Sequence, residues 1–123
     1  DRPWGFLSAT DVRSGRLLMS LGSPGGPAII HFAAKTLVGS LQWGLNAQQA
    51  IDLPNFGSFN GPTVLEAGRF PAATVDALKA RGHTVVLTDL PSGLQALQRM
   101  PGTGQSGWFG GADPRREGVV MGR

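Results

Sequence analysis

The feature that most constrains the fold is a glycine-rich turn between two apolar segments. The turn reads Gly22-Ser23-Pro24-Gly25-Gly26, and it lies between a short apolar stretch, residues 17–21, and a longer one, residues 27–43. The short stretch predicts a buried strand, and apolar residues three and four apart in the longer one predict a helix. The wide apolar face expected to pack inward carries Ile29, Ile30, Ala33, Ala34, Leu37, Val38 and Leu41. Pro27 suits the first helical position, because its missing N–H needs no partner there. The sequence therefore predicts a strand, a tight turn and a helix.

This turn is a candidate anion site. The start of a helix has unpaired N–H groups and a partial positive charge, and glycines have no Cβ to block a ligand. A phosphate, a carboxylate or a developing oxyanion fits these properties. The segment lacks the spacing of nucleotide-binding loops, which need Gly-Lys-Ser/Thr or Gly-x-Gly-x-x-Gly. An ordinary structural turn is the alternative interpretation.

The remaining sequence predicts an α+β fold. Further helices are expected over residues 46–52 and 71–81, and residues 55–62 are expected to form a loop. Strands are expected over residues 63–67, 84–88, 94–100, 105–112 and 118–121, and three of the strands follow one another at the end, as in an antiparallel sheet. Nineteen glycines and nine prolines among 123 residues indicate short connections, and 41% hydrophobic residues suffice for a core. We expect a single-domain piece built of layers.

Composition excludes several classes of function. The net charge of +3 comes from scattered basic residues, so no nucleic-acid partner is expected. No apolar stretch is long enough to span a membrane. The absence of cysteine excludes disulfides, thiolate ligands and a cysteine nucleophile. Two distant histidines, His31 and His83, predict neither a metal site nor a cofactor; we expect His31 to be packed in its helix and His83 to be exposed.

The chain shows no evident nucleophile of its own. No serine stands in a Gly-x-Ser-x-Gly elbow. Ser23 is the best placed of the hydroxyl residues, but a hydroxyl at a turn usually bonds the local backbone. Asp113-Pro114-Arg115 is interpreted as a structural turn in which Arg115 can reach back to a carboxylate.

Several separated motifs resemble the γ-glutamyltransferase (γ-glutamyltranspeptidase) family. One is the glycine turn with Ile29-Ile30 and the long helix behind it, and another is Ala112-Asp113-Pro114-Arg115. Between them, residues 44–51 and Pro54-Asn55-Phe56 resemble the second helix of the family and its following turn, and residues 70–82 resemble its helix-to-strand step. The resemblance covers nearly the whole chain.

The resemblance implies an N-terminal-nucleophile hydrolase with a four-layer αββα sandwich. Such enzymes are made as one precursor that cuts itself into a large and a small subunit, and the new N-terminal Thr is the nucleophile. This chain corresponds to the C-terminal part of the small subunit, so the Thr is expected upstream and outside it. The implied partners are the large subunit, the rest of the small subunit and a γ-glutamyl or other acyl-amide substrate. The implied location is periplasmic or secreted.

The resemblance also assigns site residues. The backbone N–H groups of Gly25 and Gly26 match the oxyanion hole of the family. Gly5 and Phe6 stand where the family has a serine pair that binds the α-carboxylate of the glutamyl group. Because neither side chain can donate a hydrogen bond, we expect an altered acyl specificity.

Two other readings remain open. The chain could be a non-catalytic fragment, or an anion-binding or interaction module in its own right. Because an isolated part of a sheet has exposed strand edges, we expect the isolated piece to form oligomers.

Overall fold

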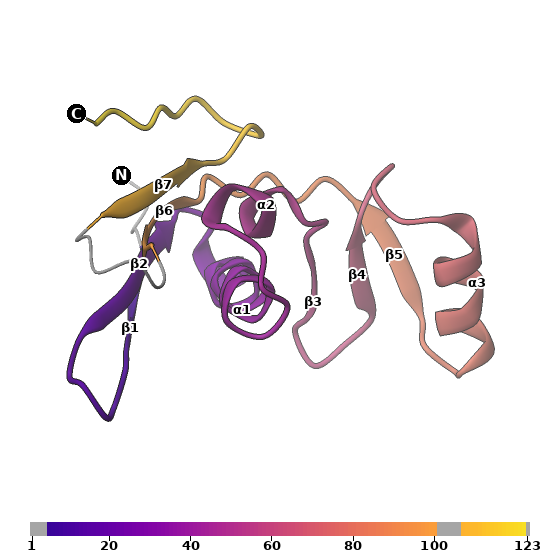
Figure 1. The fold of residues 1–123 in the computed structure, drawn as a ribbon. Helices are drawn as coiled ribbons and strands as arrows, with labels where there is room; N and C mark the ends of the chain where they lie inside the picture. The colour runs from indigo at the N-terminus through magenta and orange to yellow at the C-terminus, as the bar shows by residue number, and fades with distance from the viewer. Residues whose placement is uncertain (1–4, 101–106, 123) are drawn as a thin grey trace. The chain divides into compact units, whose positions relative to one another are not determined.

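The computed structural model describes residues 5–100 and 107–122, and the chain divides into two compact units. The larger unit is formed by Asp1–Leu53 together with Ser92–Arg123, and the smaller unit is Pro54–Pro91. In Figure 1 the larger unit runs from indigo to magenta and again from orange to yellow, and the smaller unit runs from magenta through rose to orange. The first two residues of the strand expected over residues 105–112 lie outside the described residues.

The larger unit contains a four-stranded antiparallel sheet. Its strands are β1 (Gly5–Thr10), β2 (Leu17–Ser23), β6 (Gln95–Arg99) and β7 (Trp108–Ala112), in the order β1-β2-β6-β7. The β1 and β2 strands form a hairpin, in which Leu7 pairs with Leu21. Leu21 in turn pairs with Ala96, and Ala96 pairs with Gly111. Residues from distant parts of the sequence therefore share one row across the sheet.

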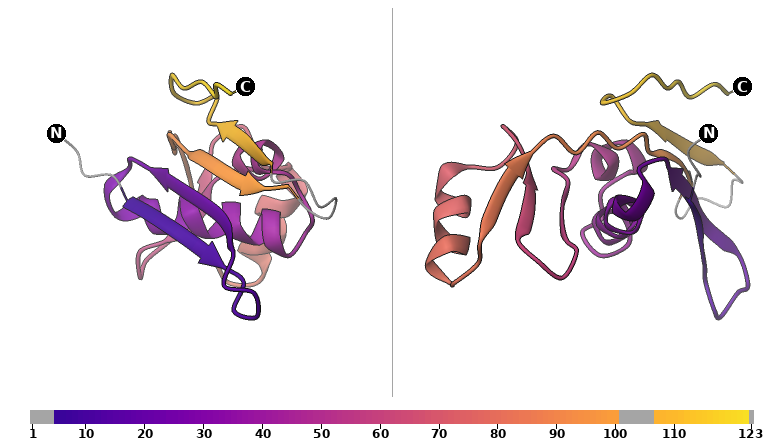
Figure 2. Two further views of the ribbon diagram at one scale, coloured as in Figure 1. Left: turned by 60° about the vertical axis from the view of Figure 1, so that its left-hand side comes forward. Right: turned by 180° about the vertical axis from the view of Figure 1, so that it is seen from behind.

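This row lies on the face of the sheet that two helices cover (Figure 2). Leu21 and Ala96 are buried here. A Cβ on Gly111 would lie 2.9 Å from Cδ1 of Ile51, and one on Gly5 would lie 2.6 Å from Cγ2 of Ile29. The helices approach the sheet closely because these positions lack side chains.

The long helix α1 (Ile29–Leu41) follows a single 3-10 turn, η1 (Gly26–Ala28). The predicted helix therefore exists, with Pro27 in its first turn. Its predicted inward face is partly wrong: Ile30, Val38 and Leu41 are exposed. The buried face instead carries small, polar or aromatic residues, namely Phe32, Ala33, Lys35, Thr36, Gly39 and Ser40. Gly39 lets α1 approach the next helix, because a Cβ there would lie 3.2 Å from Cβ of Ala50.

The short helix α2 (Ala47–Asp52) begins as the sequence predicts. The Asn46 side chain accepts a hydrogen bond from the Gln49 N–H, and the Gln49 side chain accepts one from the Asn46 N–H. This capping box satisfies two donors that the helix start leaves unpaired. The Gln48 side chain then bonds both the N–H and the carbonyl of Ala112, which fixes α2 to β7.

The smaller unit is a three-stranded sheet with one helix. Strands β3 (Phe56–Ser58), β4 (Thr63–Glu66) and β5 (Val85–Thr88) lie in the order β3-β4-β5. Helix α3 (Ala72–Ala80) connects β4 to β5, which therefore run parallel. Asn55 is buried before β3; its N–H bonds the Glu66 carboxylate, and its side chain donates to the Leu90 carbonyl.

Several predicted elements need correction. Strands β1 and β3 were not expected, because Gly5–Thr10 and the loop around Phe56 show little apolar alternation. Strand β5 lies in the smaller sheet and not beside β6, since its crossover helix makes it a partner of β4. The expected strand at residues 118–121 does not form. This segment instead lies against the sheet, where a Cβ on Gly110 would meet the side chain of Val120.

Candidate functional site

The glycine turn connects β2 to η1 and has a backbone that favours glycine. Gly25 has φ +140° and Gly26 has φ +58°, both in the region that residues with a Cβ rarely adopt. A Cβ on Gly25 would lie 2.8 Å from the Phe32 ring, whereas one on Gly26 would meet open space. None of the hydrogen bonds found for the described residues starts from either amide N–H. The turn therefore presents two N–H groups at the start of a helix.

Ser23 is not available as a nucleophile. It is the last residue of β2 and has no exposed surface. Its Oγ donates a hydrogen bond to the Pro24 carbonyl at 2.7 Å and accepts one from the Gly93 N–H at 3.0 Å. The interpretation of this hydroxyl as a local backbone partner is confirmed.

The sheet places Gly5 and Phe6 beside this turn. Gly5 pairs with Ser23 and Phe6 pairs with Gly22 across the β1–β2 hairpin. The Phe6 side chain points to the face that the helices leave uncovered, and 79% of its surface is exposed. Gly22 accommodates the ring, because a Cβ on Gly22 would lie 2.7 Å from Cδ1 of Phe6.

An open groove of about 330 Å³ runs along this uncovered face. Phe6 and Leu97 line it from the sheet, and Val119, Val120 and Met121 line it from the segment that crosses the sheet. These side chains are apolar and exposed. The surroundings of Phe6 are therefore apolar as well.

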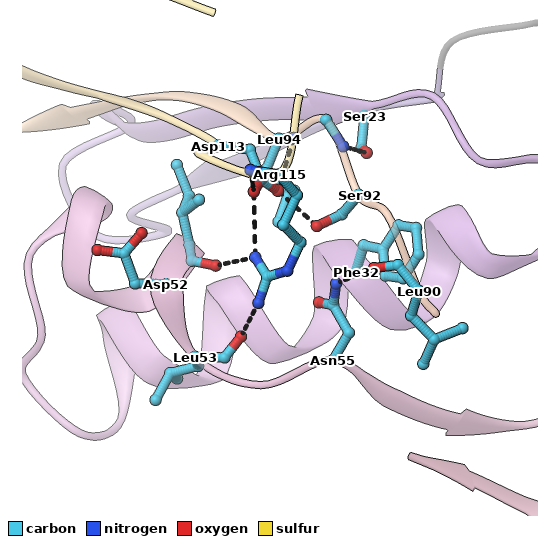
Figure 3. A network of polar contacts seen from close by, with 12 residues as sticks. Ser23, Phe32, Asp52, Leu53, Asn55, Leu90, Ser92, Leu94, Asp113 and Arg115 are labelled. Atoms are coloured by element: carbon cyan, nitrogen blue, oxygen red, sulfur yellow. Dashed lines mark hydrogen bonds and ion pairs between the residues drawn. The ribbon is translucent and has the colours of Figure 1, made fainter. Parts of the chain in front are cut away.

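Asp113 and Arg115 form a buried polar network behind the turn (Figure 3). Oδ2 of Asp113 accepts hydrogen bonds from the Ser92 hydroxyl and from the Leu94 N–H. Its Oδ1 accepts from the Arg115 N–H and from Nη1 of Arg115, 3.0 and 3.1 Å away. Asp113 is 1% exposed, so this pair is internal. The structural interpretation of Asp113-Pro114-Arg115 is confirmed.

Two cations bind the carbonyl end of α2. The Arg115 guanidinium donates to the carbonyls of Ile51 and Leu53, at 3.0 and 2.9 Å. The Lys35 ammonium, on α1, donates to the carbonyls of Ala50, Ile51 and Leu53. The end of a helix has unpaired carbonyls and a partial negative charge, which both cations satisfy. Sequence reasoning missed Lys35, although a single lysine inside an apolar helix is a signal for such a role.

The two histidines belong to different units of the chain. His31 is half-buried on α1, and His83 is exposed, with Nδ1 3.4 Å from Oγ1 of Thr63. Across residues 5–100 and 107–122, no three acidic or histidine side chains gather in a way that could hold a metal ion. Over the same residues, no helix has the length and apolar character needed to cross a membrane.

Comparison with known proteins decides the family. The family model described as gamma-glutamyltranspeptidase matches residues 2–123. The chain belongs to the gamma-glutamyltranspeptidase family. The glutathione hydrolase proenzyme of Escherichia coli (strain K12) is 31% identical over 116 residues, which are 93% of this chain and 20% of that protein. The acylase ACY 1 proenzyme of Pseudomonas sp. (strain V22) is 31% identical over 107 residues, 84% of this chain and 19% of the acylase.

The fold also matches solved structures, among them a gamma-glutamyltranspeptidase. The T380A mutant of the Helicobacter pylori enzyme superposes with a TM-score of 0.81 at 24% identity, over 91% of this chain and 61% of that one. The structure of LmbA2991HD gives a TM-score of 0.72 at 29% identity, over 89% of this chain and 22% of that one. The chain thus has the α+β fold of this N-terminal-nucleophile hydrolase family. It spans about a fifth of the length of the curated relatives it matches.

Proposed function

We propose that this chain is the oxyanion-binding part of an acyltransferase or amide hydrolase. Family membership supports acyl transfer in general, and the turn supports the finer role. The N–H groups of Gly25 and Gly26 are the donors that would stabilise the tetrahedral oxyanion. An N-terminal Thr outside this chain would be the nucleophile, and the large subunit and the rest of the small subunit would be the partners. A periplasmic or secreted location belongs to the same proposal.

The reaction would proceed through an acyl-enzyme. The Thr hydroxyl would attack the carbonyl carbon of an acyl amide, and the carbonyl oxygen would take the negative charge. Collapse of this intermediate would release the amine and leave the acyl group on the Thr. Water or a second amine would then attack the ester, through a second oxyanion at the same two N–H groups. Gly25 and Gly26 would thus act in both halves of the reaction.

The acyl specificity would differ from that for γ-glutamyl compounds. The main observation is the β1–β2 register, which places Gly5 and Phe6 next to the turn, and neither residue has a side-chain donor for a carboxylate. A hydrogen bond to a charged group is worth about 1.5 kcal/mol or more, so losing two costs about 3 kcal/mol. That corresponds to roughly a hundredfold loss in kcat/KM. Phe6 and the apolar groove favour an acyl group without an α-carboxylate.

The test compares two p-nitroanilides with the complete, self-processed protein. We expect a short apolar acyl anilide to be cleaved faster than the γ-glutamyl anilide. Phe6→Ser should improve kcat/KM for the γ-glutamyl anilide by about tenfold, because it restores one hydroxyl. Phe59→Ser, which alters an exposed phenylalanine of the smaller unit, should change neither rate.

Three outcomes would count against the proposal. Rapid cleavage of the γ-glutamyl anilide by the unaltered protein would refute the altered specificity. No effect of Phe6→Ser would remove Phe6 from the acyl site. No cleavage of any acyl anilide would refute the enzymatic role and leave an anion-binding or interaction module.

A further inference from the structure

Two buried hydrogen bonds of Ser23 connect the glycine turn to a segment far away in the sequence. The Ser23 hydroxyl bonds the Pro24 carbonyl inside the turn and the Gly93 N–H outside it. Pro24 directly precedes Gly25, so this hydroxyl connects the turn to residues 92–94. Both bonds are buried, since Ser23 is 0% exposed. Water therefore cannot replace either bond without a change in the structure.

Residues 92–94 are themselves held on both sides of Gly93. The Ser92 hydroxyl and the Leu94 N–H both donate to Oδ2 of Asp113. The other oxygen of Asp113 is held by Arg115 (Figure 3). The Gly93 N–H, between these two anchors, has little freedom to move away from Ser23.

Close packing against Pro24 further restricts the position of Gly93. A Cβ on Gly93 would lie 3.0 Å from both Cγ and Cδ of Pro24 and 2.9 Å from Cδ of Arg116. The Pro24 ring therefore lies directly on the Gly93 backbone. A shift of residues 92–94 would displace Pro24, and with it the first N–H of the turn.

We propose that Ser23, with Ser92 and Asp113 behind it, is a positioning residue for the oxyanion donors. This inference rests on the proposed function, since it assumes that Gly25 and Gly26 bind an oxyanion. None of the three side chains touches the reacting atoms; they act through the Gly93 N–H and the Pro24 carbonyl. Loss of the Ser23 hydroxyl would free the turn to move, and displacement by about 1 Å can cost on the order of a hundredfold in rate.

The experiment is Ser23→Ala in the complete, self-processed enzyme, with rates expressed per active site by titration of the acyl-enzyme burst. We expect kcat to fall about ten- to a hundredfold, with KM close to the unaltered value, because only the transition state carries the oxyanion. The inhibition constant of a boronate that forms a tetrahedral adduct should rise by a similar factor. Binding of the product acid should not change. Ser23→Thr, which keeps the hydroxyl, should restore most of kcat.

Ser40→Ala is the matched control. Ser40 is also buried and also bonds a distant side chain, since its Oγ accepts from Nε2 of Gln98, but it does not contact the turn. It should lower the melting temperature and leave kcat per active site unchanged.

The outcomes separate this inference from the proposed function. An active unaltered enzyme whose kcat per site survives Ser23→Ala would overturn the positioning role alone, and so would an equal loss of kcat in Ser40→Ala. An unaltered enzyme with no activity would overturn the proposed function instead. If Ser23→Ala yields no folded protein, Ser92→Ala decides: a fall in kcat at constant KM supports the role, and an unchanged kcat overturns it.

Discussion

The carbonyl end of α2 offers a quantitative test, because two cations share its acceptors. Lys35 and Arg115 both donate to the carbonyls of Ile51 and Leu53, and Lys35 also donates to Ala50. In Lys35→Met, Arg115 still donates hydrogen bonds to the carbonyls of Ile51 and Leu53, and only the Ala50 carbonyl loses its cation. We expect the loss of about one charge-assisted hydrogen bond, about 1.5–3 kcal/mol.

The double variant should lose more than the sum of the single ones. Arg115→Met also breaks the ion pair with Asp113, but that contribution appears in both arms of a double-mutant cycle and cancels. What remains is the cost of leaving the shared carbonyls of Ile51 and Leu53 with neither cation. We expect a coupling free energy of about 1–3 kcal/mol.

Amide hydrogen exchange in the complete protein measures this locally. The Ala50 N–H, which bonds the Asn46 carbonyl at 2.9 Å, reports the opening of α2 in all four proteins of the cycle. Lys79→Met, at an exposed lysine of α3, is the control and should not alter exchange in α2. If the losses of free energy in Lys35→Met and Arg115→Met add to within about 0.5 kcal/mol in the double variant, the two cations do not depend on the same carbonyls.

Three further predictions concern stability and association. Gly111→Ala should lower the free energy of unfolding by about 1–3 kcal/mol, since its Cβ would lie 2.9 Å from Cδ1 of Ile51; an unchanged melting temperature would contradict this. Asn46→Ala should cost about 1 kcal/mol by breaking the capping box with Gln49, and faster exchange confined to the first turn of α2 would confirm it. The isolated chain should form dimers or larger species through its open strand edges and the face that carries Phe6, and a monodisperse monomer in light scattering would argue against this.

The sequence predicts elements well where local chemistry decides them. The capping box at Asn46, the proline in the first turn before α1 and the pairing of residues 94–100 with the following strand all depend on near neighbours. The glycine turn was also predictable, because its two positive φ values leave few alternatives to glycine.

The sequence fails where distant residues decide. Gly5–Thr10 becomes a strand because it pairs with Leu17–Ser23 and faces α1, not because it alternates clearly. The buried face of α1 includes Lys35, because the carbonyls of α2 offer its ammonium three acceptors. Such partners cannot be seen along one helix, so the face that apolar periodicity selected was only partly the buried one.

The same limit applies to the candidate site. Residue spacing alone predicted an anion site at the glycine turn, but it could not identify the residues that hold the turn in position. The bond between Ser23 and Gly93 spans 70 residues and follows no local rule. Only the folded structure shows that Asp113 bonds Ser92 and Leu94, the residues on either side of Gly93.

The polar network at Asp113 and Arg115 forms late during synthesis, because it joins residues that are far apart in the sequence. The larger unit is interrupted by Pro54–Pro91, and its flanking residues Leu53 and Ser92 are bound by Arg115 and Asp113 respectively. The ribosome makes the glycine turn long before it makes Asp113 and Arg115. The β1–β2 hairpin can form early, but the hydrogen bonds that Asp113 makes to Ser92 and Arg115 makes to Leu53 can form only after residues 113–115 have been synthesised. A nascent chain that stops before residue 113 would contain Gly25 and Gly26, but it would lack the hydrogen bonds through which, in our proposal, Asp113 and Ser92 hold the residues that bond Ser23.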